Sequence, residues 1–190
     1  MITRQQAWDK VNELIKIQNL VKHCLAVECA MRAYYDYFGV EADRTRNDAE
    51  RELWGIAGLV HDADWEAFPD EHPGVIVEWL REQGASDDVI NAVEAHVWEF
   101  GIEAKSLMAK TLRACDELTG LIVAVTLVKD RHLANVTVES VLNKWKKKEF
   151  ARGVKREDIE RGAEEIGVPV ENHIEVVLEA MKRNAESLGL

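Results

Sequence analysis

The sequence is poor in the residues that interrupt regular secondary structure. Its 190 residues include 11 glycines and 3 prolines, which is about 7% of the chain against a usual level of roughly 12%. Chains with many tight turns, such as all-β sandwiches, use more of both residues. The composition therefore argues against an all-β or loop-rich fold.

Cysteines and long apolar segments are also scarce. The 3 cysteines, at positions 24, 29 and 115, are an odd number and do not form a disulfide framework. We interpret them as core residues, because each lies among Ala, Leu and Val at helical spacing. The longest apolar stretch, 121–128, is interrupted by Thr126, and no basic–apolar signal pattern opens the sequence. We therefore expect a soluble, cytoplasmic protein with no membrane partner.

Basic residues are outnumbered by acidic ones, 24 against 35, which gives a net charge of −11. Such a charge repels nucleic acid at long range, so we expect no DNA partner. Residues 144–156 nevertheless carry seven basic side chains and one acid, Glu149. This basic stretch has two interpretations. It is either a solvated helix face, the usual role of a charge run, or it lets Lys147, Lys148 or Arg152 bind a substrate phosphate.

Apolar residues recur at helical spacing along nearly the whole chain, and 47% of the residues are hydrophobic, enough for a core. The first predicted helix has its N-cap at Thr3 and continues through Ile15, and the second covers Leu20–Phe38 and stops at Gly39. The third covers Asn47–Val60, and three more begin at Pro73, Ser86 and Ser106. The last three cover Val138–Phe150, Arg156–Ile166 and Val170–Leu188. Residues 120–128 have a strand-like composition but no partner strand, so we expect them to end the helix from Ser106. The sequence predicts a single all-α domain over residues 1–190.

Histidines and acidic residues combine at three places in these predicted helices. His23 lies beside an apolar helix face, where a hydrogen-bonded core histidine is the common alternative to a ligand. His61 and Asp62 follow a buried helix, and two neighbouring side chains can hold one ion only where a helix ends. Asp116 lies in an apolar helix, so its carboxylate needs either Arg113, one turn away, or a cation.

Together His23, His61, Asp62 and Asp116 supply two imidazoles and two carboxylates. This set suits a divalent transition metal, such as Mn, Co, Ni, Fe or Zn, with open positions for water and substrate. We assign no site role to His132 and His173.

The pattern His23 … His61-Asp62 … Asp116 resembles the HD-domain superfamily of metal-dependent phosphohydrolases. The local sequences "VKHCLAVECAMRAYYDYFG", "IAGLVHDADWE" and "LRACDELTGL" are similar to the family around its first His, its His-Asp doublet and its last Asp. The resemblance covers about residues 20–125. The tail "KKKEFARGVKREDIERGAEEIG" is similar to the C-terminal extension of small bacterial HD proteins, which implies an HD core followed by a helical extension over residues 135–190.

The resemblance also bears on His72 and His96. Some branches of the superfamily bind two metal ions, among them the HD-GYP phosphodiesterases and the diiron oxygenases. These proteins place two further histidines between the His-Asp doublet and the last Asp, and the Asp of the doublet bridges the two ions. His72 and His96 occupy similar places here; their alternatives are a helix-cap residue and a core histidine. The chain lacks the Gly-Tyr-Pro motif and a His-His pair at 96–97, so it does not read as a cyclic-dinucleotide enzyme.

The leading hypothesis is a metal-dependent phosphohydrolase for a small phosphate ester such as a nucleotide, present as a monomer or homodimer. Asp62 would bind the metal ion, one or two per chain, that activates a water molecule. Asp64 would position this water or hydrogen-bond a metal ligand. The alternatives are a diiron oxygenase on the same scaffold, and a non-catalytic binding module stabilised by its metal.

Overall fold

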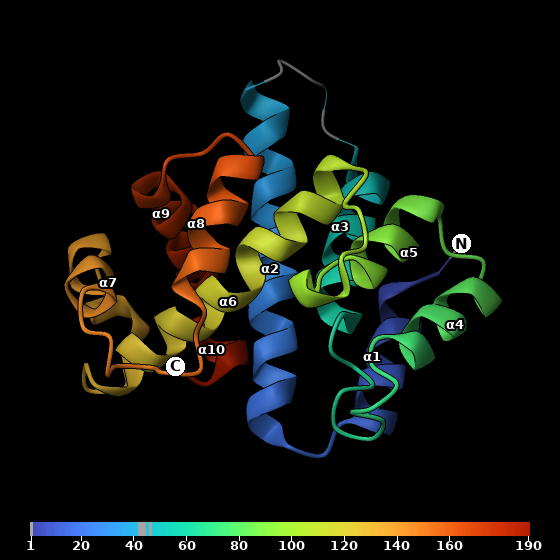
Figure 1. Ribbon diagram of the computed structural model, residues 1–190, viewed down its shortest axis with the longest axis horizontal. Helices are drawn as coiled ribbons and strands as arrows, with labels where there is room; N and C mark the ends of the chain where they lie inside the picture. Colours follow the sequence, from blue (N-terminus) through green and yellow to red (C-terminus); the bar gives the residue numbers. More distant parts are fainter. Residues whose placement is uncertain (1, 42–44, 46) are drawn as a thin grey trace.

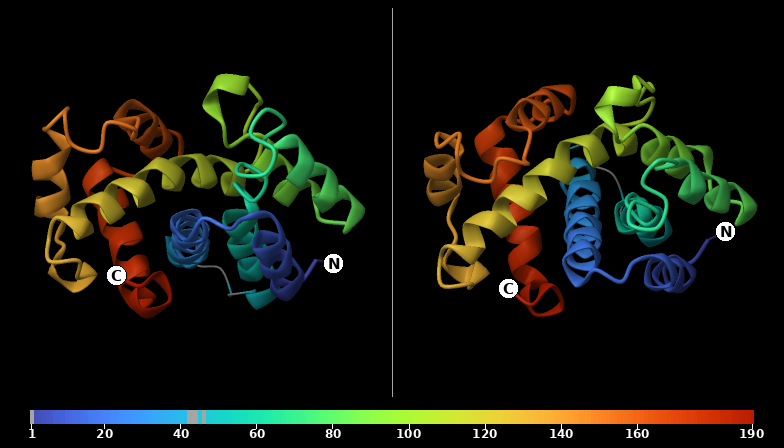
Figure 2. Two further views of the ribbon diagram at one scale, coloured as in Figure 1. Left: turned by 90° about the horizontal axis from the view of Figure 1, so that it is seen from below. Right: turned by 60° about the horizontal axis from the view of Figure 1, so that its bottom comes forward.

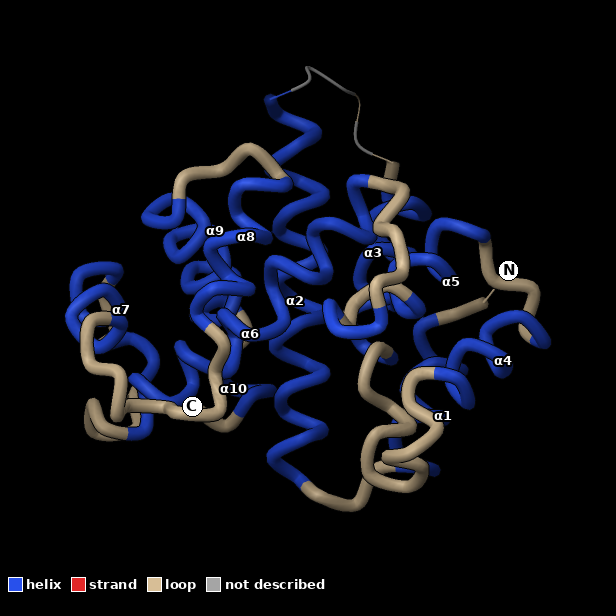
Figure 3. The backbone as a smooth tube through the Cα atoms, viewed as in Figure 1, coloured by secondary structure: helices blue, strands red, loops and turns tan. Residues whose placement is uncertain are grey.

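Helices make up nearly all of the regular structure in the computed structural model, which describes residues 2–41, 45 and 47–190. The α-helices are α1 (Arg4–Leu14), α2 (Gln18–Glu41), α3 (Asp48–Val60), α4 (Gly74–Glu82), α5 (Asp87–Glu94), α6 (Leu107–Leu127), α7 (Val138–Trp145), α8 (Arg156–Glu165), α9 (Val170–Arg183) and α10 (Ala185–Leu188). Two short 3-10 helices, η1 (Trp98–Phe100) and η2 (Leu133–Asn135), lie in the connections. Within the described residues no strand is present (Figure 3), so the predicted all-α class is confirmed.

The starts of several helices follow from local side-chain caps. Thr3 begins α1 with a capping box, in which the backbone N–H of Thr3 donates to Gln6 Oε1 and the N–H of Gln6 donates to the Thr3 hydroxyl. Asn47 caps α3, and Ser106 caps α6 by accepting the N–H of Ala109. These are the positions at which the sequence predicts the helices to begin.

Several predicted helix ends are wrong. α2 passes through Gly39 and ends at Glu41; the helical penalty of one glycine, about 1 kcal/mol, is small beside the packing of this helix against the core. α7 ends at Trp145 rather than Phe150, because the basic residues that follow are exposed and bury no apolar stripe. The closing helix is divided at Asn184 into α9 and α10.

The central helix of the fold is α2, which runs vertically through Figure 1. α3 packs along one side of it and α9 along the other, and α6 crosses over it and also contacts α8 (Figure 2). The first histidine candidate lies on α2, the His-Asp doublet follows α3, and Asp116 lies on α6. The packing of these three helices therefore brings residues distant in sequence to one place.

Gly58 allows α3 to approach α2 closely. A Cβ atom at this position would lie 2.8 Å from the carbonyl oxygen of Val27 and 2.9 Å from Cγ of Met31, both on α2. Such distances are too short for any side chain, so only glycine permits this contact. Because His61 lies one turn after Gly58, the close approach also sets its distance from His23.

One buried polar pair lies in the core away from the candidate ligands. His173 on α9 is fully buried, its Nε2 donates to the carbonyl oxygen of Ala114 at 2.8 Å, and the hydroxyl of Tyr34 donates to its Nδ1. Both ring nitrogens are therefore satisfied by a neutral imidazole. The absence of a site role for His173 agrees with this placement.

The three cysteines are free and buried, as predicted. Among the described helices, none is both long enough and apolar enough to cross a lipid bilayer.

Candidate metal centre

The first group of candidate ligands joins α2, the end of α3 and α6. Nε2 of His23 lies 3.2 Å from Nε2 of His61 and 3.0 Å from Oδ1 of Asp116. Oδ2 of Asp62 lies 3.5 Å from the Nε2 atoms of both His23 and His61. Atoms bonded to one ion at about 2.1 Å lie about 3.0 to 3.4 Å apart at angles between square and tetrahedral. The distances between these atoms, 3.0 to 3.5 Å, are close to the spacing of ligands around one ion.

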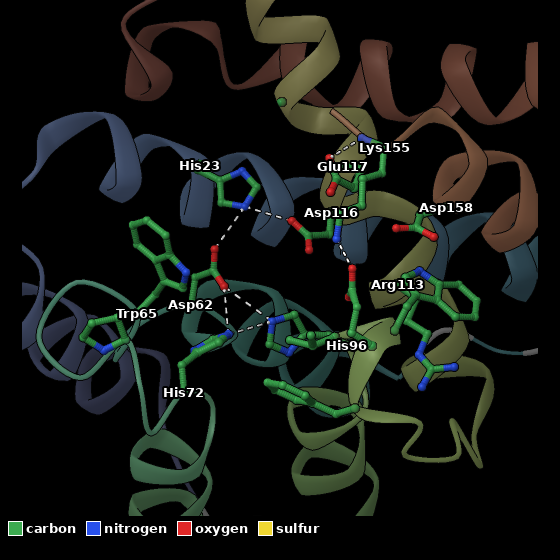
Figure 4. A pocket seen from close by; sticks show the side chains of 16 residues that line it. His23, Asp62, Trp65, His72, His96, Arg113, Asp116, Glu117, Lys155 and Asp158 are labelled. Carbon is green, nitrogen blue, oxygen red and sulfur yellow. Dashed lines mark hydrogen bonds and ion pairs between the residues drawn. The ribbon is translucent and has the colours of Figure 1, made fainter. Parts of the chain in front are cut away.

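The second group uses the other oxygen of Asp62. Its Oδ1 lies 3.5 Å from Nε2 of His72 and 3.4 Å from Nε2 of His96, and these two nitrogens are 3.3 Å apart. His72 comes just before α4 and His96 just after α5. The structure thus places His72 and His96 with the predicted ligands, and Asp62 between the two groups presents one oxygen to each (Figure 4).

The Nδ1 atom of each histidine has an acceptor on the side away from the cluster. These acceptors are Gly58 O for His61 (2.8 Å), Val93 O for His96 (2.6 Å), Asp64 Oδ1 for His72 (2.7 Å) and Thr119 Oγ1 for His23 (3.3 Å). A neutral imidazole that donates from Nδ1 carries a bare lone pair on Nε2. Second partners of this kind are typical of metal-ligating histidines, because they fix the ring and its tautomer.

The consequence is an arrangement that needs positive charge at its centre. Four Nε2 lone pairs and the carboxylates of Asp62 and Asp116 point toward one another over distances of 3.0 to 3.5 Å. Without cations or added protons these groups repel one another, and their burial makes the repulsion costly. The donor set, four nitrogens and two carboxylates, fits borderline transition metals such as Mn, Fe, Co, Ni or Zn.

A family model for the HD domain matches residues 20–121 of the chain. This match covers more than half of the sequence and includes all six candidate ligands. The chain belongs to the HD-domain family. Neither a curated protein nor a solved structure matches the chain significantly. The resemblance noted from the sequence motifs is therefore confirmed at the level of the family.

We call the six candidate ligands the HD cluster (His23, His61, Asp62, His72, His96 and Asp116). Asp64 contacts this cluster at Nδ1 of His72, on the side of the ring away from the other ligands. Its side chain is fully buried, Oδ1 accepts the Nδ1 hydrogen of His72, and Oδ2 accepts the backbone N–H of Ile76 at 2.9 Å. Of the two roles expected for Asp64, the structure shows the contact with a candidate ligand. Asp64 is not among the described residues that line the cavity, and its two oxygens face His72 and the backbone of Ile76.

The charge distribution of the HD cluster shifts the pKa values of its members. Burial works to lower the pKa of His61, but the carboxylates of Asp62 and Asp116 outweigh it and raise the value to about 9. Against the effect of burial, the facing imidazoles hold the pKa values of Asp62 and Asp116 below their ordinary range. Protons and metal ions therefore compete for the same nitrogens, and metal binding should weaken as the pH falls.

A cavity of about 550 Å³ opens over the cluster. Three aromatic side chains, Trp65, Trp98 and Phe100, form part of its wall; Trp65 is 51% exposed and Phe100 52% exposed. The volume lies within the roughly 300 to 1,000 Å³ of pockets that bind small molecules. The cavity is thus large enough for a small substrate with an apolar or aromatic part.

Arg113 shapes one wall of this cavity. Its guanidinium donates to the carbonyl oxygens of Ala95 and Ile102, at the two ends of the segment that carries His96 and η1, and lies 4.3 Å from the ring centroid of Trp98. Arg113 therefore interacts with this segment, and not with Asp116 as the sequence alternative supposed. Asp116 faces His23 and His61 instead.

Residues of α6, of α8 and of the connection just before α8 contribute the other wall, which the sequence analysis missed. Glu117, Lys155 and Asp158 line the cavity. Burial and the adjacent carboxylate of Asp116 raise the pKa of Glu117 to about 7. The only sequence feature that pointed to this wall was the basic stretch 144–156, which includes Lys155.

Three other members of that basic stretch lie elsewhere. Lys147, Lys148 and Arg152 are exposed, and the residues that line the cavity do not include them. Arg152 pairs with Glu149, and Lys148 lines a separate hollow beside α7 and α8.

Proposed function

We propose that this HD protein is a metal-dependent phosphohydrolase with two metal ions, acting on a small phosphate ester such as a nucleotide. The observation that carries the proposal is the inward direction of four histidine Nε2 atoms around the two oxygens of Asp62. The cavity above this cluster supplies room for the substrate.

The ligand assignment follows from the two groups. His23, His61, Asp116 and Oδ2 of Asp62 would hold one ion, and His72, His96 and Oδ1 of Asp62 would hold the other. When bound, such ions neutralise phosphoryl oxygens and lower the pKa of a bound water molecule. Few ligands per ion leave coordination positions for that water and for the phosphate.

The remaining residues of the site position these groups. The Nδ1 contacts hold each ring in the orientation that ligation requires, so little reorganisation is needed when ions bind. Asp64 does this for His72 with a charge-assisted hydrogen bond of 2.7 Å, which also makes the imidazole a stronger donor to a metal. The aromatic side chains of Trp65 and Phe100 would reduce the access of bulk water once a substrate lies between them.

The diiron oxygenase remains the second candidate, because the same histidine-rich ligand set also suits two iron ions. The two activities differ in what they consume. An oxygenase needs iron and removes O₂ from solution, whereas a phosphohydrolase releases inorganic phosphate with redox-inactive ions as well. A binding module would show neither activity.

These candidates can be separated with one preparation. We expect the purified protein to hold close to two metal ions per chain, measured by mass spectrometry, and to release phosphate from a panel of esters when reconstituted with Mn, Co or Ni in preference to Mg. An oxygen electrode in the same assays should show no substrate-dependent O₂ uptake. A clear Mg preference, or O₂ uptake without phosphate release, would count against the proposal.

The matched variant is Asp62→Ala, with Asp70→Ala as control. Asp70 is an exposed carboxylate in the same loop, so its loss changes charge near the site without removing a ligand. Asp62→Ala should lose both ions and all phosphate release while circular dichroism stays helical; Asp70→Ala should keep both. Retention of two ions in Asp62→Ala would overturn the bridging assignment.

A further inference from the structure

Lys155 is the central residue of the part of the cavity wall that lies outside the matched family region. This residue precedes α8, beyond the residues 20–121 that the HD model covers. Its backbone N–H donates to Oε2 of Glu117 at 3.2 Å. Figure 4 shows Lys155 beside Glu117 and Asp116, on the far side of the cluster from His72 and Trp65. The start of the Lys155 side chain is therefore fixed next to the metal ligands.

Among the described residues that line the cavity, two carry a permanent positive charge. Arg113 is committed, because its guanidinium donates to two backbone carbonyls and stacks on Trp98. Lys155 is held less firmly: its ammonium forms an ion pair with the carboxylate of Glu99, and the two side chains are 52% and 54% exposed. Exposed ion pairs of this kind contribute little to stability, so their partners exchange readily.

Glu99 reaches this pair from η1, which belongs to the matched HD region and is distant in sequence from Lys155. Both residues line the cavity, and the Glu99 carboxylate occupies the position that an anion beside Lys155 would take. Glu117 and Asp158 add negative charge on the same side. Without Lys155 this side of the cavity would repel an anionic substrate, and with it there is one place where an anion is stabilised.

We propose that Lys155 binds a second anionic group of the substrate, one that the metal ions do not hold, and that Glu99 occupies this position in the free protein. The substrate class is then a phosphate ester that carries a further carboxylate or phosphate. Binding exchanges the Glu99–Lys155 ion pair for a substrate–Lys155 ion pair. The inference rests on the proposed function for the identity of the first group, a metal-bound phosphoryl group.

The two residues are expected to act in opposite directions. Lys155→Ala removes the cation and should weaken binding of the second anionic group. Glu99→Gln removes the competing charge at constant size, and should strengthen that binding. If the ion pair only joined the extension to the HD core, both substitutions would loosen the same wall and both would weaken binding.

The test uses calorimetric titration of the Mn²⁺-loaded protein, which requires no turnover. The probes are alkylphosphonates with chains of two to five carbons, and the same phosphonates with a terminal carboxylate. We expect the carboxylate to improve the Kd about tenfold at one or more chain lengths, as one charge-assisted contact would. Lys155→Ala should lose this gain and leave the Kd of the plain alkylphosphonates unchanged, whereas Glu99→Gln should increase the gain.

The control is Lys146→Ala, which removes an exposed charge from the same basic stretch outside the cavity. It should keep the full carboxylate gain. Three results would overturn the inference. The terminal carboxylate could fail to improve the Kd at any chain length, or Lys146→Ala could lose this improvement as fully as Lys155→Ala does. The improvement could also be lost in both Lys155→Ala and Glu99→Gln. Plain phosphonate binding without hydrolysis of any ester would instead refute the proposed function alone, and binding by neither series would refute both.

Discussion

Acidification should destabilise the fold through His173, a buried histidine that is not one of the candidate ligands. Burial lowers the pKa of this imidazole to about 4, below its ordinary value of 6.5. Between these two values the unfolded chain binds a proton that the folded chain does not, so the free energy of unfolding falls as the pH decreases. The contribution of His173 is fully present above pH 6.5 and is lost as the pH approaches 4.

The size of the effect follows from the same two values. A shift of this extent corresponds to about 3 kcal/mol in total at the standard conversion for one pKa unit. Integrated only from pH 7 to pH 5, the loss is about 2 kcal/mol, because the folded state is still almost unprotonated at pH 5. The structural cause is specific: a second ring proton at Nδ1 would face the hydroxyl of Tyr34, and the charge would lie in an apolar core.

The assay is urea unfolding followed by circular dichroism at pH 7 and pH 5, with EDTA present so that metal release does not contribute. The reference is His173→Gln, whose amide can donate to the carbonyl of Ala114 but does not titrate in this range. Subtracting the pH effect of the variant from that of the natural protein removes the contribution of the other histidines. A difference near 2 kcal/mol supports the reasoning. Equal pH effects in the two proteins would show that His173 is protonated in the folded state, and would refute it.

The other predictions concern the cluster and the packing of the extension. His72→Ala combined with His96→Ala should lower the metal content from two ions to one per chain; unchanged content would show that these two histidines hold no ion. Asp64→Asn should weaken the second ion about 10- to 100-fold in a metal titration, while equal affinity would show that the contact with His72 is unimportant. Gly162→Ala should cost about 1 to 3 kcal/mol in urea unfolding, because its Cβ would lie 2.6 Å from Cα of Ala114; a neutral result would mean that α8 can shift on α6.

Four of the candidate ligands, His23, His61, Asp62 and Asp116, could be anticipated from the sequence because each lies in a local helical pattern. His61 and Asp62 follow a continuous buried helix, and Asp116 interrupts an apolar one. Helical periodicity is a local property, so the elements that carry these residues could be predicted with their approximate ends. That His72 and His96 face Asp62 depends on how the chain folds back between α3 and α5, and periodicity does not report this.

The cavity wall could not be predicted for the same reason. Lys155 reaches the site because α8 packs on α6, a contact made possible by the absence of a side chain at Gly162. Arg113 is one helical turn from Asp116, and sequence spacing alone suggested an ion pair between them. The structure satisfies Arg113 with the carbonyl oxygens of Ala95 and Ile102, a non-local choice that only the complete packing determines.

The contact between Arg161 and Trp98 has a consequence for how such a protein can change over time. Arg161 on α8 lies 3.9 Å from the ring centroid of Trp98, so the extension contacts directly the segment that carries His96 and η1. All six ligands precede α7 in the chain, whereas Lys155, Asp158 and Arg161 follow it. Part of the cavity wall is therefore encoded in a later stretch of the gene than the six candidate ligands. Substitutions in that stretch, by selection or by design, can alter this part of the wall and leave the ligands in place.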